Sequence, residues 1–581
     1  MNYQFTSHRN IQIVIALLKK NGIKRVVTSP GVTDMAINFS LQHDNFFELY
    51  SCVDERSAAY MACGMAAETG EPVVLTCTGA TSSRNYMPGM TEAYYRHLPV
   101  LAITCSQPSS RIGHYFNQVT DRNHLPTDVA EESVCAQVIV SPDDEWDVTV
   151  KVNKAIIGLR RNGGGPCHIN LEIGDGGNFY CKSIPPARSI DLVAKNPQMP
   201  PIMFEKVAVF VGQHSVWSKE LTALVDRFCE IYNAIVICDQ TSNYKGKYGV
   251  LISLINDQAE EKYNTRPPEI DLIIHIGYVS NVMIRGKEVW RINEDGQIRD
   301  TFHKLRKVFQ MTELDFFTHY AGANSETKDT SFYKDYNGRY EHLLNSIPEL
   351  PFSNLWVAQM IAGRFPENSV LHLGIRNSLR SYEYFRIPQT VSVYSNTGGF
   401  GIDGGVSSLI GASLIHPEKL YFGVFGELLF FYDMNSIGNR HIQNNLRIII
   451  VNNGLGQEFK NYSCSSSAFG SETDAFIAAK GHFGCQSRQL IKGYAETLGF
   501  EYMCANDKEE FLSVCDRFLT PDNLTRPILL ELFTNTSDED EALQRVTLIS
   551  NKSKFLKSAK RIIDRPEMVK AKDLIKKIAG K

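Results

Sequence analysis

The chain lacks several features that would narrow its class at once. No apolar run approaches the roughly 20 residues that a membrane-spanning helix needs, and the polar residues 1–8 have no signal-peptide pattern. The 13 cysteines include no Cys-x-x-Cys pair, which favours buried apolar side chains in a reducing compartment over zinc ligands or disulfides. The net charge of −4 argues against a nucleic-acid surface. These absences predict a cytoplasmic protein with no membrane or nucleic-acid partner.

Length and composition fit a large multidomain protein. At 581 residues the chain exceeds what one hydrophobic core supports, and roughly 150 residues per domain gives three or four units. With 43% hydrophobic and 21% charged residues, its composition is that of a globular protein and not of a fibrous or disordered one. Short apolar runs alternate with amphipathic stretches, as they do in β-α-β units. We therefore predict an α/β protein with three Rossmann-like parallel-sheet domains.

Breaks in this pattern set the expected domain limits. A proline-rich stretch, 184–201, indicates a linker. We expect domains at 1–184, 202–335 and 351–545. A lysine-rich tail, 546–581, is either a solvated amphipathic helix or a contact for an acidic partner. Strands are expected at 25–27, 47–53, 73–77, 100–104, 168–171, 207–212, 234–239, 272–277, 370–374, 420–426 and 446–451.

The most informative pattern places an acid and a paired amide at two strand ends. Glu427 follows strand 420–426, and Asn452-Asn453-Gly454 follows strand 446–451. A right-handed crossover sets both strand ends side by side on the ligand-binding edge of a parallel sheet. A carboxylate and an amide oxygen there suit Mg²⁺, which keeps its other positions for phosphate and water. The alternative is an acid and an Asn-Asn turn that simply face solvent.

This spacing resembles the signature of thiamine-diphosphate enzymes of the pyruvate decarboxylase and acetolactate synthase type, and the resemblance covers nearly the whole chain. Within that superfamily, residues 395–404 (SNTGGFGIDG) and 426–435 (GELLFFYDMN) look most like the SEPHCHC synthases of the menaquinone pathway. Glu427 stands where the family usually has Asp. The resemblance implies pyrimidine-binding, central and diphosphate-binding domains in that order, with thiamine diphosphate and Mg²⁺ as cofactors.

The resemblance also implies contacts to these cofactors from the third domain. Glu427 and Asn453 match the family's metal ligands, and Leu455 would offer its backbone carbonyl to the metal. Ile402 matches a large aliphatic residue that bends thiamine diphosphate, although an Ile between glycines can also be a plain packing residue. Further cofactor contacts are expected from Asn377, Ser378, Gly426, Leu428 and Leu429.

In the first domain, the resemblance points to Glu55 as the acid that activates the cofactor. Asp54-Glu55-Arg56 matches the family's glutamate motif, in which the carboxyl group hydrogen-bonds a nitrogen of the cofactor's pyrimidine ring. The alternative is a helix N-terminal acid favoured by the helix dipole. Asn85 ends residues 76–85 (TCTGATSSRN), which resemble a loop beside the cofactor, and a structural role for Asn85 is equally open.

A second loop of the first domain, residues 112–121 (IGHYFNQVTD), resembles the one that contributes a Phe and a Gln to acetolactate synthase active sites. Phe116 and Gln118 are therefore candidates for substrate contact. His114 is a candidate for proton transfer, because the pKa of histidine is ordinarily about 6.5. The alternative for His114 is a solvated loop side chain.

Departures from the SEPHCHC synthase pattern concern the substrate. Val32-Thr33, Gln107 and Thr397 replace three arginines that would grip substrate carboxylates. Each lost charged hydrogen bond costs about 1.5–3 kcal/mol, so we expect a different substrate. The arginines that could hold a single carboxylate or phosphate instead are Arg84, Arg376 and Arg380.

The sequence thus predicts a thiamine-diphosphate and Mg²⁺ enzyme that decarboxylates a 2-oxo acid and transfers an acyl carbanion equivalent to a carbonyl acceptor. The alternatives are a simple 2-oxo acid decarboxylase, a SEPHCHC synthase and a non-catalytic homologue. The family implies a homodimer or tetramer, with one cofactor shared across a dimer interface. No flavin is expected, because no Gly-x-Gly-x-x-Gly turn follows strand 207–212.

Overall fold

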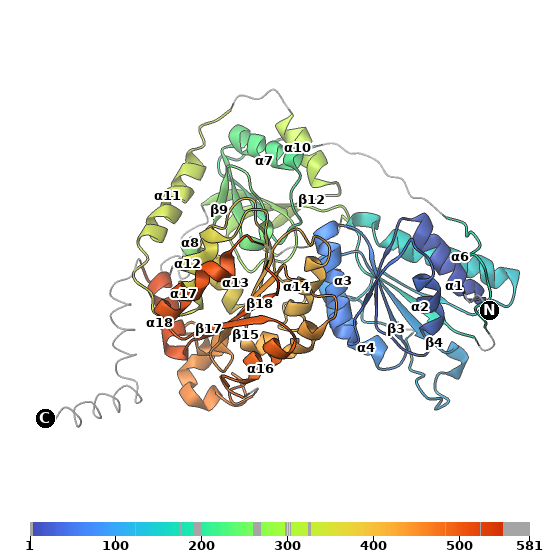
Figure 1. Cartoon of the computed structure of the whole chain (residues 1–581). Coiled ribbons are helices and arrows are strands. Elements are labelled where there is room, and N and C mark those ends of the chain that lie inside the picture. The colour runs from blue at the N-terminus through green and yellow to red at the C-terminus, as the bar shows by residue number, and fades with distance from the viewer. Residues whose placement is uncertain are drawn as a thin grey trace.

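The computed structural model describes residues 4–549 except 123, 175–176, 190–198, 259–268, 297–298, 300, 303, 323–326, 483 and 523. The described chain forms three six-stranded sheets whose paired strands all run parallel, with helices packed against them (Figure 1). The predicted fold class is confirmed. Residues 550–581 of the predicted tail and residues 190–198 of the predicted linker lie outside the described residues. Helix α18 (Thr536–Thr547) crosses residue 546, where the tail was predicted to begin.

The first sheet has the strand order β2-β1-β3-β4-β6-β5. Its strands are β1 (Arg25–Thr28), β2 (Glu48–Ser51), β3 (Val73–Thr78), β4 (Val100–Ser106), β5 (Glu132–Ala136) and β6 (Cys167–Glu172). Its helices are α1 (Arg9–Lys20), α2 (Met35–Gln42), α3 (Glu55–Thr69), α4 (Ser82–Asn85), α5 (Met87–Tyr95) and α6 (Pro142–Gly158).

The central sheet has the order β12-β11-β10-β7-β8-β9. Its strands are β7 (Val207–Val211), β8 (Ala234–Cys238), β9 (Gly249–Leu251), β10 (Ile270–Ile276), β11 (Gly286–Ile292) and β12 (Leu305–Phe309). The helices here are α7 (Lys219–Tyr232), α8 (Ser253–Asn256), α10 (Glu313–Ala321) and α11 (Ser331–Asn345). Helix α11 runs across residue 335, where the central domain was predicted to end.

The third sheet has the order β14-β13-β15-β16-β18-β17. Its strands are β13 (Val370–Leu373), β14 (Ser392–Tyr394), β15 (Tyr421–Gly426), β16 (Leu446–Asn452), β17 (Glu501–Ala505) and β18 (Ile528–Phe533). Its helices are α12 (Asn354–Ile361), α13 (Asn377–Tyr382), α14 (Gly405–Ser413), α15 (Glu427–Tyr432), α16 (Leu490–Thr497), α17 (Lys508–Leu519) and α18 (Thr536–Thr547).

Strand order fixes where the third sheet can bind a ligand. The chain winds outward in one direction from β13 to β14 and in the other from β15 to β17, so the order reverses between β13 and β15. Open parallel sheets bind ligands at such a reversal, beyond the carboxyl ends of the strands. Residues that follow β13, β15 and β16 therefore converge at one crevice.

The first and third domains share a hydrophobic core that is built around one helix pair. Helix α3 crosses α14, and Figure 1 shows the two helices side by side. The backbones approach closely because small residues line the crossing: a Cβ on Gly64 would lie 2.1 Å from the carbonyl oxygen of Ser408, and one on Gly411 would lie 2.3 Å from that of Met61. This contact places the N-terminus of α3, with Glu55, against the third domain.

We expect Gly64→Ala to destabilise the protein, because its Cβ would meet backbone atoms that cannot rotate away. Overpacking of this kind costs about 1–3 kcal/mol, and thermal denaturation of the full chain would show a lower Tm. Gly338→Ala is the matched control, since no atom lies within 4 Å of a Cβ at this helical glycine. An equal effect of the two substitutions would contradict the tight crossing.

Candidate functional site

Glu427 lies at the end of β15 as the first residue of α15, where the sequence predicted an acid. Its side chain is buried, with 4% of the residue exposed, and lies close to the backbone N–H groups of Asn453 and Leu455. The Leu455 N–H donates to Asn453 Oδ1 at 3.3 Å. Among the described residues, none donates to Glu427 Oε1. Burial, with a smaller contribution from the charge of the nearby Glu539, raises the pKa of Glu427 to about 8. Glu427 is therefore a buried acid with one oxygen left for a ligand.

A second acid, Glu539, lies beside Glu427, and the sequence reasoning missed it. Glu539 accepts the backbone N–H of Asn354 at 2.9 Å, and burial raises its pKa to about 7. The side chain of Asn354 in turn donates to Ser378 Oγ at 3.2 Å, while its own Oδ1 has no partner among the described residues. The run of acids after β18 looked like a surface feature, because nothing local marks Glu539 as buried.

These oxygens suit a hard divalent cation. Two buried oxygens, Glu427 Oε1 and Asn354 Oδ1, lack partners in the described chain, and Asn453 and Leu455 lie next to Glu427. The described residues contain no group of three or more His, Cys, Asp or Glu side chains that could hold a metal. A cation here would therefore depend on amide and carbonyl oxygens as well as the carboxylate, which suits Mg²⁺.

Leu429, one of the predicted cofactor contacts, fills the space between Gly374 and Gly405. A Cβ on Gly405 would lie 2.9 Å from the Leu429 side chain, and one on Gly374 would lie 3.2 Å from it. The cavity between these residues measures only about 10 Å³, room for a single water molecule. Asn377 and Ser378 begin α13, which follows β13 in the chain, but do not line this cavity. Leu429 leaves no room for a diphosphate between Gly374 and Gly405.

The remaining predicted contacts of the third domain, Ile402, Gly426 and Leu428, do not line this cavity. Ile402 is half-buried and packs against both hydrophobic cores that meet in the third domain. The next residue, Asp403, accepts a hydrogen bond of 3.0 Å from Tyr60 on α3. Gly426 has open space around its Cα, and Leu428 follows it at the start of α15. Ile402 thus lies where the first and third domains meet.

Glu55 is the first residue of α3, and its carboxyl group is oriented by Asn85. Asn85 Nδ2 donates to Glu55 Oε2 at 2.9 Å and to Asp54 Oδ1 at 2.8 Å. Asp54 also caps the helix by accepting the N–H of Ser57. The structure thus gives Asn85 the structural role that the sequence left open. Its predicted contact with a cofactor stays a prediction.

Polar contacts join the start of α3 to the third domain. Ser57 Oγ donates to Asp433 Oδ1 at 3.3 Å, and Asp433 also accepts the N–H of Ser407 at 2.6 Å. Arg56 donates to the carbonyl oxygen of Tyr432 at 2.5 Å. Burial raises the pKa of Asp433 to about 6. Glu55 therefore lies on a helix end that is anchored to the domain carrying Glu427.

Asp34 is a further acid that the sequence reasoning missed. It is fully buried before α2, where its Oδ2 accepts a 2.8 Å hydrogen bond from Asn38 and its Oδ1 has no partner in the described chain. Burial raises the pKa of Asp34 to about 6, and the charge of Glu55 contributes to this rise. The only feature of the sequence that could have pointed to Asp34 was its position after the Ser29-Pro30-Gly31 turn at the end of β1.

The predicted substrate loop is exposed. His114, Phe116 and Gln118 all face solvent, and Arg111 lies over the Phe116 ring at 5.3 Å. Among the described residues, the side chains of His114 and Gln118 make no hydrogen bond to Glu55 or Glu427. The loop's roles in substrate contact and proton transfer stay predictions.

The three candidate arginines differ in their surroundings. Arg380 forms two 2.9 Å contacts with Glu458, so its charge is already neutralised. Arg84 donates to the carbonyl oxygen of Asp121. Arg376 is exposed at the end of β13 and lies over the Phe400 ring at 5.1 Å. Arg376 is therefore the best placed of the three to meet an incoming anion.

Comparison with known proteins agrees with this geometry. Residues 9–125 match the family described as thiamine pyrophosphate enzyme, N-terminal TPP binding domain. A thiamine diphosphate-dependent 4-hydroxybenzoylformate decarboxylase from Rhodococcus jostii RHA1 shares the fold, with a TM-score of 0.66 and 16% identity over 90% of this chain and 99% of that one. The chain is thus a homologue of thiamine-diphosphate-dependent enzymes.

Among its relatives are enzymes named 2-succinyl-5-enolpyruvyl-6-hydroxy-3-cyclohexene-1-carboxylate synthase, which are the SEPHCHC synthases named above. The one from Bacteroides thetaiotaomicron is 28% identical over 571 residues, which cover 93% of this chain and 98% of the relative. The one from Christiangramia forsetii is 28% identical over 584 residues, which cover 91% and 96%. The predicted likeness to this group is confirmed along nearly the whole chain.

The raised pKa of Glu427 predicts how stability depends on pH in the metal-free protein. The folded state binds this proton more tightly than the unfolded state, so the stabilisation is complete below pH 4.5 and is lost as the pH rises to about 8. In Glu427→Gln the fall in Tm across this range should be shallower. The exposed Glu496→Gln is the control, and an unchanged slope in Glu427→Gln would contradict the burial of a protonated acid.

Proposed function

We propose that this protein uses thiamine diphosphate and Mg²⁺ to decarboxylate a 2-oxo acid and to transfer the acyl carbanion equivalent to a carbonyl acceptor. The observation that carries the proposal is the contact between α3 and α14. It sets the helix that begins with Glu55 against the segment that contains Ile402, at the sheet edge that carries Glu427.

Residues of the third domain would hold the cofactors. Glu427 Oε1, the side-chain oxygen of Asn453 and the carbonyl oxygen of Leu455 would bind Mg²⁺. The first turn of α13, with Asn377 and Ser378, would donate to the diphosphate together with backbone N–H groups at the start of α15. Once bound, thiamine diphosphate would supply a nucleophilic ring carbon and a cationic ring that accepts the electron pair left when a 2-oxo acid loses carbon dioxide.

Other side chains would position the cofactor and protonate its pyrimidine ring. Glu55, with one oxygen held by Asn85, would hold a proton against a nitrogen of the pyrimidine ring. The half-buried Ile402 would pack beneath the bent cofactor. The shared core of the first and third domains would keep water from the reacting carbon.

Substrate choice is where the chain departs from its relatives. Synthase activity like that of the relatives is the second candidate, and it is favoured by their identity over 93% of the chain. Against it stand the missing arginines, since Thr397 is an uncharged buried side chain and Gln107 donates to the carbonyl oxygen of Asn117. We infer a smaller, less charged substrate whose carboxylate meets Arg376. The protein would act in the cytoplasm as a homodimer or tetramer.

We expect Leu429→Ala to bind thiamine diphosphate more tightly, because it empties the space between Gly374 and Gly405. A gain of about tenfold corresponds to about 1.4 kcal/mol, measurable by calorimetric titration with Mg²⁺ present. Leu409→Ala is the control: it is equally buried, on α14, and each variant should lose about 2–5 kcal/mol of stability. Weaker binding by Leu429→Ala would show that this side chain supports the cofactor.

The proposed activity is tested by carbon dioxide release from a panel of 2-oxo acids, with and without an added aldehyde or ketone. Release that requires the acceptor would identify a carboligase, and release without it would identify a decarboxylase. Glu55→Gln should lower the rate by about 100-fold or more, whereas the exposed Glu71→Gln should not. Tight cofactor binding without turnover of any substrate would overturn the proposal in favour of a non-catalytic homologue.

A further inference from the structure

A buried acid of the first domain, Glu92 on α5, is hydrogen-bonded to a turn of the third domain. The side chain of Glu92 is fully buried, and its Oε2 accepts a 2.6 Å hydrogen bond from the backbone N–H of Gly399. Its Oε1 accepts a 3.2 Å hydrogen bond from the buried Arg96, one helical turn further along α5. One carboxyl oxygen of Glu92 is therefore used within the first domain, and the other is used across the domain boundary.

The turn lies directly against the backbone of α5. A Cβ on Gly398 would lie 2.7 Å from the carbonyl oxygen of Glu92, so a larger side chain would push the two domains apart. Burial raises the pKa of Glu92, and the charge of Arg96 and the N–H of Gly399 act against this rise. A buried carboxyl group is costly unless it is paired and hydrogen-bonded, and Glu92 is fully matched only while Gly399 is in place.

The residue after this hydrogen bond has a strained backbone. Phe400 has a φ of 53°, in the left-handed region that bulky side chains avoid. Such a conformation costs free energy and persists only where the surrounding structure holds it. Glu92 holds the residue before Phe400, and Ile402 lies two residues after it. The strained residue therefore separates the hydrogen bond to Glu92 from the side chain that is expected to bend the cofactor.

The other end of the same segment is held by a different helix of the first domain. Asp403 accepts a 3.0 Å hydrogen bond from Tyr60 on α3, and a Cβ on Gly404 would lie 2.1 Å from the Tyr60 ring. Ile402 therefore lies between two contacts with the first domain, one through Glu92 on α5 and one through Tyr60 on α3.

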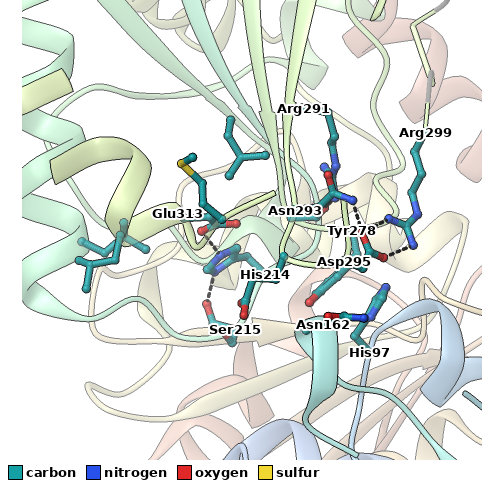
Figure 2. A pocket seen from close by; sticks show the side chains of 17 residues that line it. His97, Asn162, His214, Ser215, Tyr278, Arg291, Asn293, Asp295, Arg299 and Glu313 are labelled. Atoms are coloured by element: carbon teal, nitrogen blue, oxygen red, sulfur yellow. Dashed lines mark hydrogen bonds and ion pairs between the residues drawn. The ribbon is translucent and has the colours of Figure 1, made fainter. Parts of the chain in front are cut away.

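Helix α5 is itself anchored on both sides. Helix α4 ends at Asn85, which orients Glu55, and α5 begins two residues later. After the other end of α5, the ring of His97 stacks on that of Tyr278 in the central domain, with centroids 4.7 Å apart, and both residues line the pocket in Figure 2. Glu92 thus reaches Gly399 from an element whose position relative to Glu55 is fixed.

We propose that Glu92 is a positioning residue of the candidate active site, which through Gly399 fixes the strained turn before Ile402 and so sets the geometry of the cofactor against Glu55. This inference rests on the proposed use of thiamine diphosphate. Glu92 is buried behind the turn and would act on how fast the reactive ring carbon of the bound cofactor loses its proton. It would have little effect on affinity, because the metal and diphosphate contacts proposed above lie on other segments.

The first measurement uses the full-length protein without cofactor or metal. Amide hydrogen exchange, followed by mass spectrometry, should be faster across residues 398–404 in Glu92→Met than in wild type, because the Gly399 N–H loses its acceptor. Glu92→Gln keeps one acceptor oxygen and should be intermediate. Unchanged exchange in a folded Glu92→Met protein would show that Glu92 does not hold the turn.

The second measurement follows hydrogen–deuterium exchange at the reactive ring carbon of thiamine diphosphate bound with Mg²⁺, expressed per bound cofactor. In Glu92→Met we expect this exchange to be at least about tenfold slower than in wild type, since small misplacements of reacting groups cost up to about 100-fold. The Kd for the cofactor, from calorimetric titration, should change by less than about threefold. Glu92→Gln should recover part of the exchange rate.

A second variant guards against a folding defect. Glu92→Met leaves Arg96 buried without its acid, so the double variant Glu92→Met/Arg96→Met is measured beside it. Apolar side chains of similar volume often replace a buried ion pair without loss of stability. Both variants should show the same slow exchange at the ring carbon.

Glu68→Gln is the matched control. Glu68 has 5% of its side chain exposed, lies at the opposite end of α3 from Glu55, and accepts a 3.0 Å hydrogen bond from Tyr421 of the third domain. Its two exchange rates should equal those of wild type. A wild-type rate at the ring carbon in the folded Glu92 variants would overturn the positioning role. No exchange at that carbon in wild type would instead overturn the proposed function, and the role of Glu92 with it.

Discussion

The crossing of α3 and α14 is the constraint on which the rest of the candidate site depends. Without side chains at Gly64 and Gly411, the two helix backbones approach closely enough for the first and third domains to share one hydrophobic core. Glu55 begins one of these helices, and Ile402 lies just before the other. The start of α3 and the segment before α14 are therefore held together by this packing and by the hydrogen bonds that Asp403 and Asp433 accept.

Two buried oxygens mark the place where a cation is inferred. Glu427 Oε1 and Asn354 Oδ1 have no hydrogen-bond partner among the described residues at the third sheet. Leaving such groups unmatched costs free energy, and a bound cation would offset that cost.

The same crevice also shows how the chain differs from a generic cofactor site. Glu427 is longer by one methylene than the expected Asp, and it lies close to the backbone N–H groups of Asn453 and Leu455. Leu429 fills the space between Gly374 and Gly405. Both features arise from packing, which a sequence motif alone does not reveal.

The sequence by itself determined the fold class and the strand-end motifs, because apolar runs and the residues that follow them are local signals. Strands were found at every predicted range, and Glu427 stands at the end of β15 as expected. The sequence analysis missed β5, β9, β11, β12, β14, β17 and β18. Short or partly polar runs such as β5, β9 and β17 carry little signal, but β18 is an apolar, buried run that the analysis overlooked.

Only the tertiary structure decided which polar residues become buried and which face one another. Asp34, Glu539 and Glu92 gain their character from neighbours that are distant in sequence, and burial shifts the pKa of each. Conversely, Arg380 lost its candidate role because Glu458, 78 residues away, already neutralises it. Burial and pairing of charges are properties of the packed chain, so no local pattern could have predicted them.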